Sequence, residues 1–237
     1  MIRKVDNADN KRSFFKTVSL VPKNKQNKWD RINFLPTRSI AAVGATERFI
    51  SLYRTKRLFL ENNFMRHIAK PKEGEYPPYA DMYIRLVPGD GLLLKHLQDS
   101  FAMMKELIIS LPEEKLTYRY AANKWTIKET LVHIVDDERI YAYRALRFAR
   151  NDNTELPGFE QDDYALYSRA NERSIENIFE EYKAVRESTI TLLNGLPDEA
   201  FLRMGTANNN KATVRALAYH IAGHELHHVN IIKGKYL

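Results

Sequence analysis

Four histidines lie within nine residues near the C-terminus of the chain: His220, His224, His227 and His228. At roughly 100° per residue in a helix, all four project onto one side. Apolar residues of the same segment share that side: Leu217, Ile221, Ile231 and Ile232. The imidazoles therefore point toward the predicted core, where burial without partners is costly. A transition metal would satisfy such a cluster, because histidine is its commonest protein ligand.

The absence of cysteine narrows the chemistry of that site. The 237 residues include no cysteine, which excludes thiolate zinc sites, disulfides and a cysteine nucleophile. Any metal must then be held by nitrogen and oxygen. No apolar run approaches the roughly 18 residues of a membrane span, and the stretch 13–21, interrupted by Lys16, is too short for a signal-peptide core. We expect a cytoplasmic protein that does not enter a membrane, in keeping with a reducing compartment.

The net charge of +7 is unevenly distributed along the chain. Residues 1–75 carry 17 Lys and Arg against 7 Asp and Glu, whereas residues 76–237 carry 20 against 23. A basic arm of this kind can bind nucleic acid or an anionic surface, but a solvated extension is the interpretation that we favour. The slightly acidic region that holds the histidines argues against DNA as its ligand.

The periodicity predicts an all-α protein, a four-helix bundle over 70–237 preceded by a basic extension over 1–69. Within the extension, 38–69 has the pattern of a single helix, and the Pro- and Gly-containing stretch 70–79 is typical of an extended lead-in. Strand-like alternation is nearly absent. Four long helical patterns follow, at residues 90–110, 126–150, 174–194 and 213–233. Four amphipathic helices of this length favour a bundle, whose core can house a metal site.

Local signals support these boundaries. Thr126 and Glu129 have the spacing of a capping box at the start of the second helix. Gly195 is placed as a C-cap of the third helix, with Pro197 just beyond it. A short helical turn is expected near residues 162–168, within the long connection after the second helix.

Three histidines are the predicted metal ligands: His133, His224 and His228. Residues 224 and 228 are one turn apart and offer two nitrogens to one ion, but most sites need a third ligand. His133 supplies it from the edge of the apolar face of the second helix, where Asp137 lies close enough to orient an imidazole. His220 and His227 remain alternatives, as substitute ligands or as hydrogen-bonding partners of the ligands. We assign no role to His67 and His96.

A competing motif occurs in the same helix. Residues 224–228 match the H-E-x-x-H pattern of zinc peptidases, with Glu225 as the general base. Those enzymes take a third ligand downstream, whereas residues 229–237 contain no His, Asp or Glu. We therefore set the peptidase interpretation aside and keep Glu225 as a candidate proton carrier.

These residues resemble a known family. The segment 124–133, with Trp125 and His133, together with 136–139 and the terminal Gly-His-Glu-Leu-His-His at 223–228, is similar to the DinB-like superfamily of metal-binding four-helix bundles. The segments 143–150 and 156–164 look like one bacterial branch of it. The resemblance covers about residues 70–237, and its motifs are specific only in combination.

The resemblance implies a metal triad that maps to His133, His224 and His228. It also implies zinc or nickel as the metal, an open coordination position for water or substrate, and frequent homodimers. Characterised relatives include transferases that use a low-molecular-weight thiol such as bacillithiol or mycothiol, and a mycothiol-dependent maleylpyruvate isomerase. Other members are described as hydrolases, and many have no known activity.

We therefore expect a divalent-metal-dependent enzyme acting on small molecules, of the thiol S-transferase or the hydrolase type. The ion can lower the pKa of bound water from 15.7 toward about 7, or hold a thiol as its thiolate. Asp137 or Glu225 would orient a ligand or move a proton, and Arg144 and Arg147 would bind a carboxylate substrate unless they form surface ion pairs. The main alternative is a non-catalytic, structural or stress-related metal-binding bundle, in which His220 or His227 completes the coordination. Nucleic-acid binding would depend on the basic N-terminus alone.

Met65 stands just before the region of resemblance, and we expect it to be the native first residue. Intact-mass measurement on protein from its native source checks this, because peptides from residues 1–64 would contradict it.

Overall fold

The computed structural model describes residues 65–237. Four long helices dominate: α3 (Leu93–Ile108), α5 (Ile127–Ala149), α7 (Ile175–Asn194) and α8 (Val214–Lys235). Short helices join them: α2 (Asp81–Ile84), α4 (Glu113–Leu116), α6 (Gln161–Tyr167) and the 3-10 turns η1 (Pro78–Ala80), η2 (Ala170–Glu172) and η3 (Asp198–Leu202). A hairpin of β1 (Met204–Ala207) and β2 (Asn210–Thr213) precedes α8. In the part of the chain that the structure describes, no helix combines the length and hydrophobicity of a membrane span.

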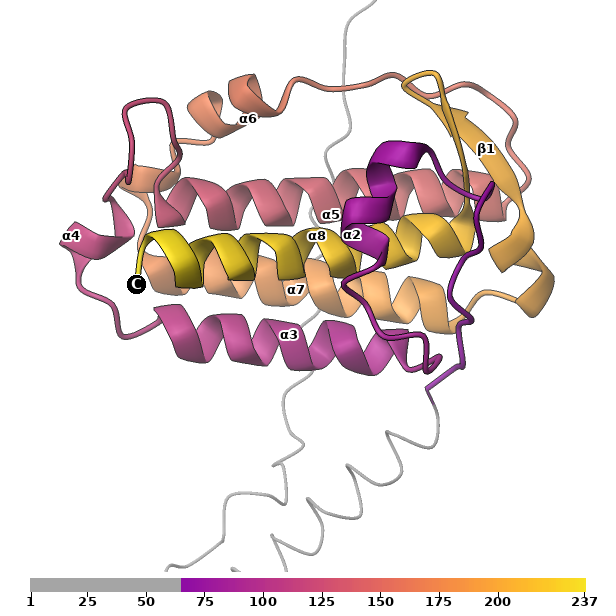
Figure 1. Cartoon of the computed structure of the whole chain (residues 1–237), viewed down its shortest axis with the longest axis horizontal. Helices are drawn as coiled ribbons and strands as arrows, with labels where there is room; N and C mark the ends of the chain where they lie inside the picture. The colour runs from indigo at the N-terminus through magenta and orange to yellow at the C-terminus, as the bar shows by residue number, and fades with distance from the viewer. Residues whose placement is uncertain (1–64) are drawn as a thin grey trace, which may run out of the picture. The chain divides into compact units, whose positions relative to one another are not determined.

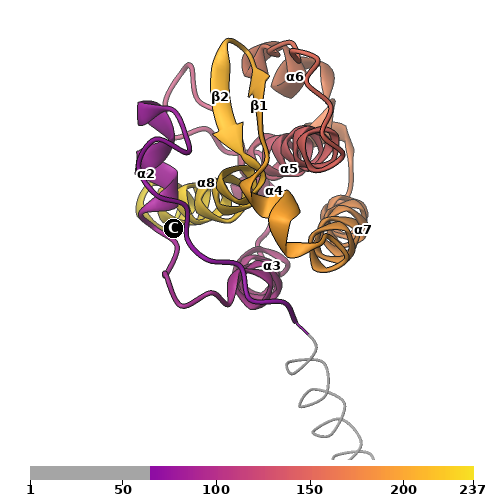
Figure 2. The same cartoon turned by 90° about the vertical axis from the view of Figure 1, so that its right-hand side faces the viewer.

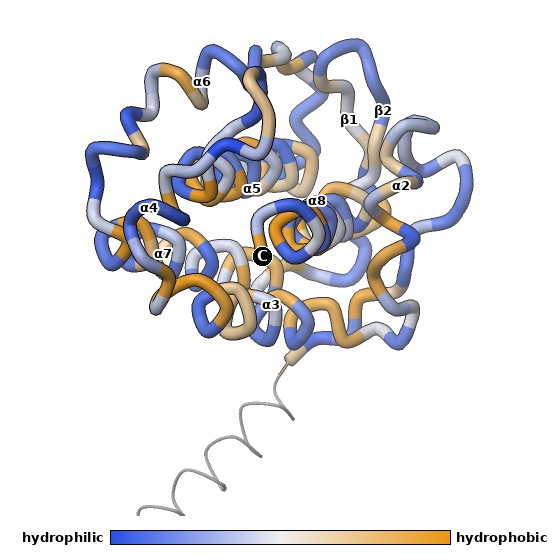
Figure 3. The backbone as a smooth tube through the Cα atoms, turned by 60° about the vertical axis from the view of Figure 1, so that its left-hand side comes forward, coloured by the Kyte–Doolittle hydropathy of each residue, from blue (hydrophilic) through white to orange (hydrophobic). Residues whose placement is uncertain are grey.

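The four long helices lie side by side as a bundle, which confirms the predicted fold class (Figures 1 and 2). Hydrophobic and hydrophilic residues both occur along the long helices (Figure 3). One hydrophobic cluster joins the first halves of α3 and α8 to the last half of α5, and a second joins the opposite halves. The helices α3 and α8 therefore run in one direction, and α5 and α7 run in the other.

Local capping fixes where three of these helices begin. The Thr126 hydroxyl accepts from the Glu129 amide, and the Glu129 carboxylate accepts from the Thr126 amide, as the capping box predicted. The side chains of Ser174 and Thr213 cap α7 and α8 by accepting from the amides of Asn177 and Ala216, without a reciprocal carboxylate. For three of the predicted long helices, both observed ends lie within two residues of the predicted ends. The first predicted helix begins at Leu93 rather than at residue 90. The predicted turn at 162–168 is α6, one residue earlier.

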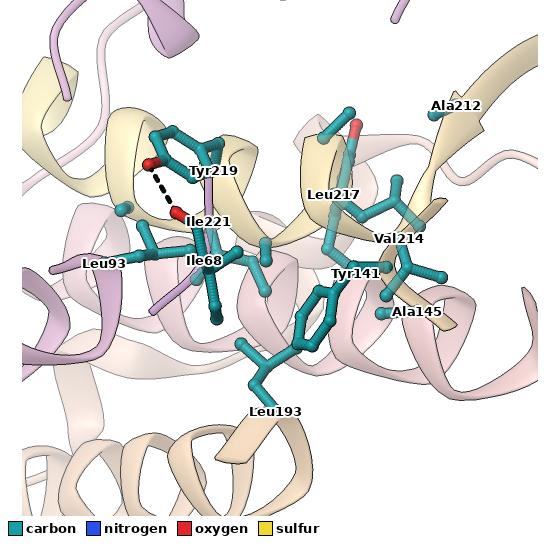
Figure 4. Close-up of a cluster of buried hydrophobic side chains, with 14 of the residues drawn as sticks. Ile68, Leu93, Tyr141, Ala145, Leu193, Ala212, Val214, Leu217, Tyr219 and Ile221 are labelled. Atoms are coloured by element: carbon teal, nitrogen blue, oxygen red, sulfur yellow. Dashed lines mark hydrogen bonds between the residues drawn. The ribbon is translucent and has the colours of Figure 1, made fainter. Parts of the chain in front are cut away.

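The lead-in before α2 is packed rather than solvated. Ile68 is buried, and its carbonyl accepts a hydrogen bond from the Tyr219 hydroxyl at 2.9 Å (Figure 4). Glu75 accepts from the Arg215 guanidinium, and its backbone carbonyl accepts from the Thr213 amide. Residues 65–69 are not helical, so the predicted helix over 38–69 is wrong at its C-terminal end. The rest of that segment, with most of the predicted extension, lies outside the described residues.

The hairpin was not predicted from the sequence. Asn208 and Asn209 join its strands with φ angles of 50° and 59°, the left-handed conformation at both central positions that suits a tight hairpin turn. Asparagine tolerates this conformation better than most residues. Strands of four residues are too short to show the alternation that identifies longer strands, and the Asn run was their only signal.

A layer of polar side chains crosses the middle of the bundle between the two hydrophobic clusters. Arg186 of α7 donates to Glu138 of α5 at 2.9 Å and to Glu225 of α8 at 2.8 Å. Ser100 of α3 and Tyr182 also donate to the Glu225 carboxylate, at 2.6 and 2.5 Å. Every long helix thus contributes a partner, and all five side chains are buried.

The short helix α2 packs unusually close to α8. A Cβ atom added at Gly223 would lie 2.2 Å from the backbone carbonyl oxygen of Tyr83. Only glycine permits this approach without displacing the α2 backbone. The contact matters because Tyr83 covers the histidines of α8, as described below.

We expect Gly223→Ala to lower the free energy of unfolding by about 1–3 kcal/mol, since overpacking outweighs the better helix propensity of alanine. Gly234→Ala is the matched control in the same helix, because a Cβ there meets nothing within 4 Å. That control should gain about 0.5–1 kcal/mol. Urea denaturation of the two variants checks this, and equal stabilisation of both would contradict the close contact.

Candidate metal centre

The structure brings together the three histidines that the sequence selected. The Nε2 atom of His224 lies 3.0 Å from Nε2 of His133 and 3.1 Å from Nε2 of His228. Within residues 65–237 this is the one group of three or more His or acidic side chains that could hold an ion, with its ligand atoms within 4.8 Å of one another. All three side chains are buried. They come from facing turns of the antiparallel pair α5 and α8.

Asp137 sits behind the triad, one turn after His133. Its Oδ2 atom lies 3.3 Å from Nδ1 of His224 and 3.4 Å from Nε2 of His220. Neither contact has hydrogen-bond geometry, but the tautomer of His224 with its proton on Nδ1 would face this carboxylate and direct the Nε2 lone pair at the other two imidazoles. A carboxylate behind a ligand imidazole is the usual way to fix its tautomer and orientation.

Aromatic rings enclose the cluster. Trp125 lies against the His133 ring, with centroids 4.5 Å apart. The Tyr83 ring makes T-shaped contacts with the rings of His220, His224 and His227, with ring centroids 5.0–5.4 Å apart. The Tyr141 ring stacks on His220 at 3.7 Å. These rings exclude water from the back of the site and hold the imidazoles in place.

Burial controls the charge of the imidazoles. It lowers the pKa of His133, and it lowers the pKa of His224 and His228 well below the usual value. Burial by itself raises the pKa of Asp137, but attraction to the imidazoles of His224 and His220 outweighs it and lowers that pKa to about 2. Three neutral imidazoles backed by an ionised carboxylate are the protonation state that metal binding requires.

The geometry fits a divalent ion. At zinc–nitrogen distances of about 2.0–2.1 Å, two ligands of a tetrahedral site lie roughly 3.3–3.4 Å apart, close to the observed 3.0 and 3.1 Å. Without an ion, the single Nε2 lone pair of His224 would have to accept hydrogen bonds from both neighbouring imidazoles at once. The donor set is nitrogen alone, which suits zinc, nickel or copper better than magnesium or calcium.

A pocket of about 310 Å³ lies beside one member of the triad, His228. His228 forms part of its wall, and Trp125, Lys124 and Asp162 form another part. Asp162 belongs to α6, which lies over the N-terminal half of α5 (Figure 1). The pocket is large enough for a small organic molecule.

The placement of Glu225 corrects the expectation that it moves protons beside the metal. Its side chain is fully buried, and its carboxylate accepts hydrogen bonds from Ser100, Tyr182 and Arg186. Residue 225 is about 100° around the helix from residue 224, so its carboxylate points to α3 and α7 instead of the imidazoles. We therefore assign Glu225 to the bundle interior.

The two remaining histidines of α8 lie outside the triad. His220 stacks on Tyr141, and within the described residues neither of its ring nitrogens has a hydrogen-bond partner. His227 is half-buried beside Tyr83. His67 is exposed, and His96 contacts Asp90.

The two arginines differ from each other. Arg147 forms an ion pair with Asp152 and donates to the Tyr143 hydroxyl. This is the surface ion pair that we considered as the alternative to substrate binding. Arg144 is buried and faces two cavities. The expectation of a paired arginine clamp is therefore not met, and only Arg144 faces a cavity.

Sequence reasoning assigned no role to Tyr83 or Asp162. Tyr83 belongs to a helix of four residues, which is too short to show a period. Asp162 was recognised only as part of a helical turn, because its proximity to His228 depends on how the long connection folds back over α5.

Comparisons with known proteins agree with this description. A family model described as the DinB superfamily matches residues 96–232. A protein of Oceanobacillus iheyensis, named "Putative metal-dependent hydrolase", is 26% identical over 142 residues, 59% of this chain and 81% of that protein.

A solved structure shows the same fold. YfiT from Bacillus subtilis, described as "a probable metal-dependent hydrolase with an unusual four-helix bundle topology", matches with a TM-score of 0.56 at 16% identity. The match covers 72% of this chain and 94% of that one. The family model spans more than half of the chain and the fold agrees with it, so this protein belongs to the DinB superfamily.

Proposed function

We propose that the protein is a divalent-metal-dependent hydrolase of small molecules, with His133, His224 and His228 as the metal ligands. The observation that carries the proposal is the convergence of three buried histidine nitrogens, one of whose residues, His228, lines a pocket of about 310 Å³. The names of the relatives in Oceanobacillus iheyensis and Bacillus subtilis support the same reaction class. Zinc and nickel are the ions that we propose for this nitrogen donor set.

A bound divalent ion supplies Lewis acidity, which acidifies water or polarises a carbonyl group of the substrate. The protein's own residues supply the remaining requirements. Asp137 holds the His224 imidazole with its Nε2 lone pair toward the site, and Trp125 packs against His133. The substrate binds in the pocket that His228 borders.

Asp162 is the proton acceptor in this proposal. Its carboxylate lines the same pocket as His228, and it is close enough to affect the charge of His133. The other carboxylates nearby have different tasks, because Asp137 contacts ligand imidazoles and Glu225 is bonded within the core. A carboxylate that faces the pocket can accept a proton from water attacking the substrate.

The alternatives make different demands on the same site. A non-catalytic bundle needs a fourth protein ligand, but His220 and His227 lie outside the group of three. A thiol S-transferase would bind the thiol in the open pocket. A reaction with an electrophile that requires the thiol would identify the protein as such a transferase. Homodimerisation and a cytoplasmic location stay predictions.

We expect the full chain, purified without a histidine tag, to bind about one zinc or nickel ion, because three neutral imidazoles converge on one point. His133→Ala and His228→Ala should each weaken binding by more than about a hundredfold, and Asp137→Asn by about 10- to 100-fold. Mass spectrometry for metals together with competition against a chelator measures this.

His96→Ala is the matched control, because His96 contacts only Asp90 in the described part of the chain. It should bind metal like the wild type. Retention of metal by His133→Ala or His228→Ala, with circular dichroism showing a folded bundle, would contradict the proposed ligand set.

We expect Asp162→Asn to reduce kcat by about 10²-fold or more with little change in metal content, because the proton acceptor is lost. Asp163→Asn is the matched control, since Asp163 is also exposed on α6 but does not line the pocket. Hydrolysis of chromogenic esters and amides by the zinc- or nickel-loaded chain provides the assay. Equal rates for the two variants would remove Asp162 from the mechanism, and an inactive wild type on the whole panel would argue against a hydrolase.

A further inference from the structure

Arg144 is a buried cation that has no acidic partner among the residues that the structure describes. The residue is 6% exposed, and its Nη2 atom donates to the Pro157 carbonyl at 3.1 Å. Its guanidinium carbon lies 5.0 Å from the centre of the Tyr141 ring. With the described residues it forms no ion pair, although a buried charge normally requires one, and its Nε and Nη1 atoms, which lack a partner there, keep accessible surface.

The other deeply buried arginine, Arg186, has its charge balanced by carboxylates. Arg186 is 2% exposed and contacts both Glu138 and Glu225, so its charge is fully matched inside the core. Arg144 has one carbonyl and one aromatic ring instead. A guanidinium has five N–H donors in a fixed fork, and most of those on Arg144 are left for a ligand.

Two cavities meet at Arg144. The smaller, about 20 Å³, also touches His220, whose ring nitrogens make no hydrogen bond with residues 65–237, although Nε2 lies 3.4 Å from the Asp137 carboxylate. The larger, about 270 Å³, is lined by three aromatic side chains: Tyr143, Phe159 and Tyr164. No acidic residue of the part of the chain that the structure describes lines either cavity. Arg139 also borders the larger one, but Glu181 neutralises it at 2.5 Å.

This arrangement is distinct from the pocket beside His228. Arg144 lies eleven residues after His133 on α5, about 16 Å along the helix axis. The walls of the larger cavity come from α5, from α6 and from the connection between them. None of the three proposed metal ligands borders it.

We propose that Arg144 anchors the carboxylate of a small organic acid whose aromatic or apolar body fills the cavity of about 270 Å³. A single uncompensated positive charge matches one carboxylate, which can accept two parallel N–H donors from the guanidinium. A phosphate dianion would bring a second charge into an apolar surrounding without a second cation to match it. The aromatic lining supplies the attraction for an aromatic or apolar body.

Benzoate is the probe that tests this site, by calorimetric titration and by the shift in melting temperature of the full chain. We expect benzoate to bind the wild type with or without zinc, and Arg144→Met to weaken binding by at least about tenfold. Methionine preserves much of the packing against Tyr141 and removes the charge. Without benzoate, Arg144→Met should be as stable as the wild type or more stable, because an unmatched buried charge is gone.

Arg139→Gln is the matched control, since that arginine borders the same cavity with its charge already paired, and it should keep benzoate binding. Benzamide and inorganic phosphate should bind at least about tenfold more weakly than benzoate. Equal benzoate binding by wild type and Arg144→Met, no benzoate binding by the wild type, or a preference for phosphate would each overturn the proposal. The result does not depend on metal binding or hydrolysis, so failure here leaves the proposed function standing.

Discussion

The buried ion-pair network of Glu138, Arg186 and Glu225 is the constraint on which the candidate metal centre depends. Glu138 directly follows Asp137 on α5, and Glu225 directly follows His224 on α8. Neighbouring residues of a helix point about 100° apart, so one member of each pair reaches toward Arg186 and the other toward the imidazoles. The network therefore fixes the rotation of both helices, and with it the convergence of the ligands. Losing one partner would leave an unmatched buried charge, at a cost of about 3–5 kcal/mol.

The two halves of this polar layer have opposite electrostatic characters. On the α3 and α7 side, charges are paired and hydrogen-bonded. Burial by itself lowers the pKa of Arg186, but attraction to the carboxylates of Glu225 and Glu138 outweighs it and holds that pKa well above its usual value. On the other side, burial keeps the imidazoles neutral. A closed network stabilises structure, whereas a cluster of neutral donors beside a pocket is suited to bind an ion. Arg144 extends the contrast, because it is a buried charge that residues 65–237 leave without an ion pair.

The bundle and the His224–His228 pair were predictable because they depend on local rules, whereas His133, on another helix, was selected from its place at the edge of an apolar face and from the family resemblance. The capping box at Thr126, the helical periods and the one-turn spacing of His224 and His228 are all determined within one helix. The direction of the Glu225 side chain was not predictable in this way, because α8 is buried on most of its circumference. The helical periodicity of α8 therefore does not show which neighbouring helix each of its residues faces. Tyr83, Asp162 and the partners of Arg144 and Arg147 depend on short elements and on the connection after α5. Their positions follow from tertiary packing, which periodicity does not describe.

The central proposal is that three imidazoles, and only three, would hold a divalent ion through their Nε2 atoms and leave a position open for water or substrate. X-ray absorption spectroscopy of the zinc- or nickel-loaded chain tests it most directly. The account predicts three imidazole nitrogens at about 2.0–2.1 Å and at least one further light atom that is not imidazole. A fourth imidazole would indicate a closed structural site that includes His220 or His227, and two or fewer would contradict the triad itself.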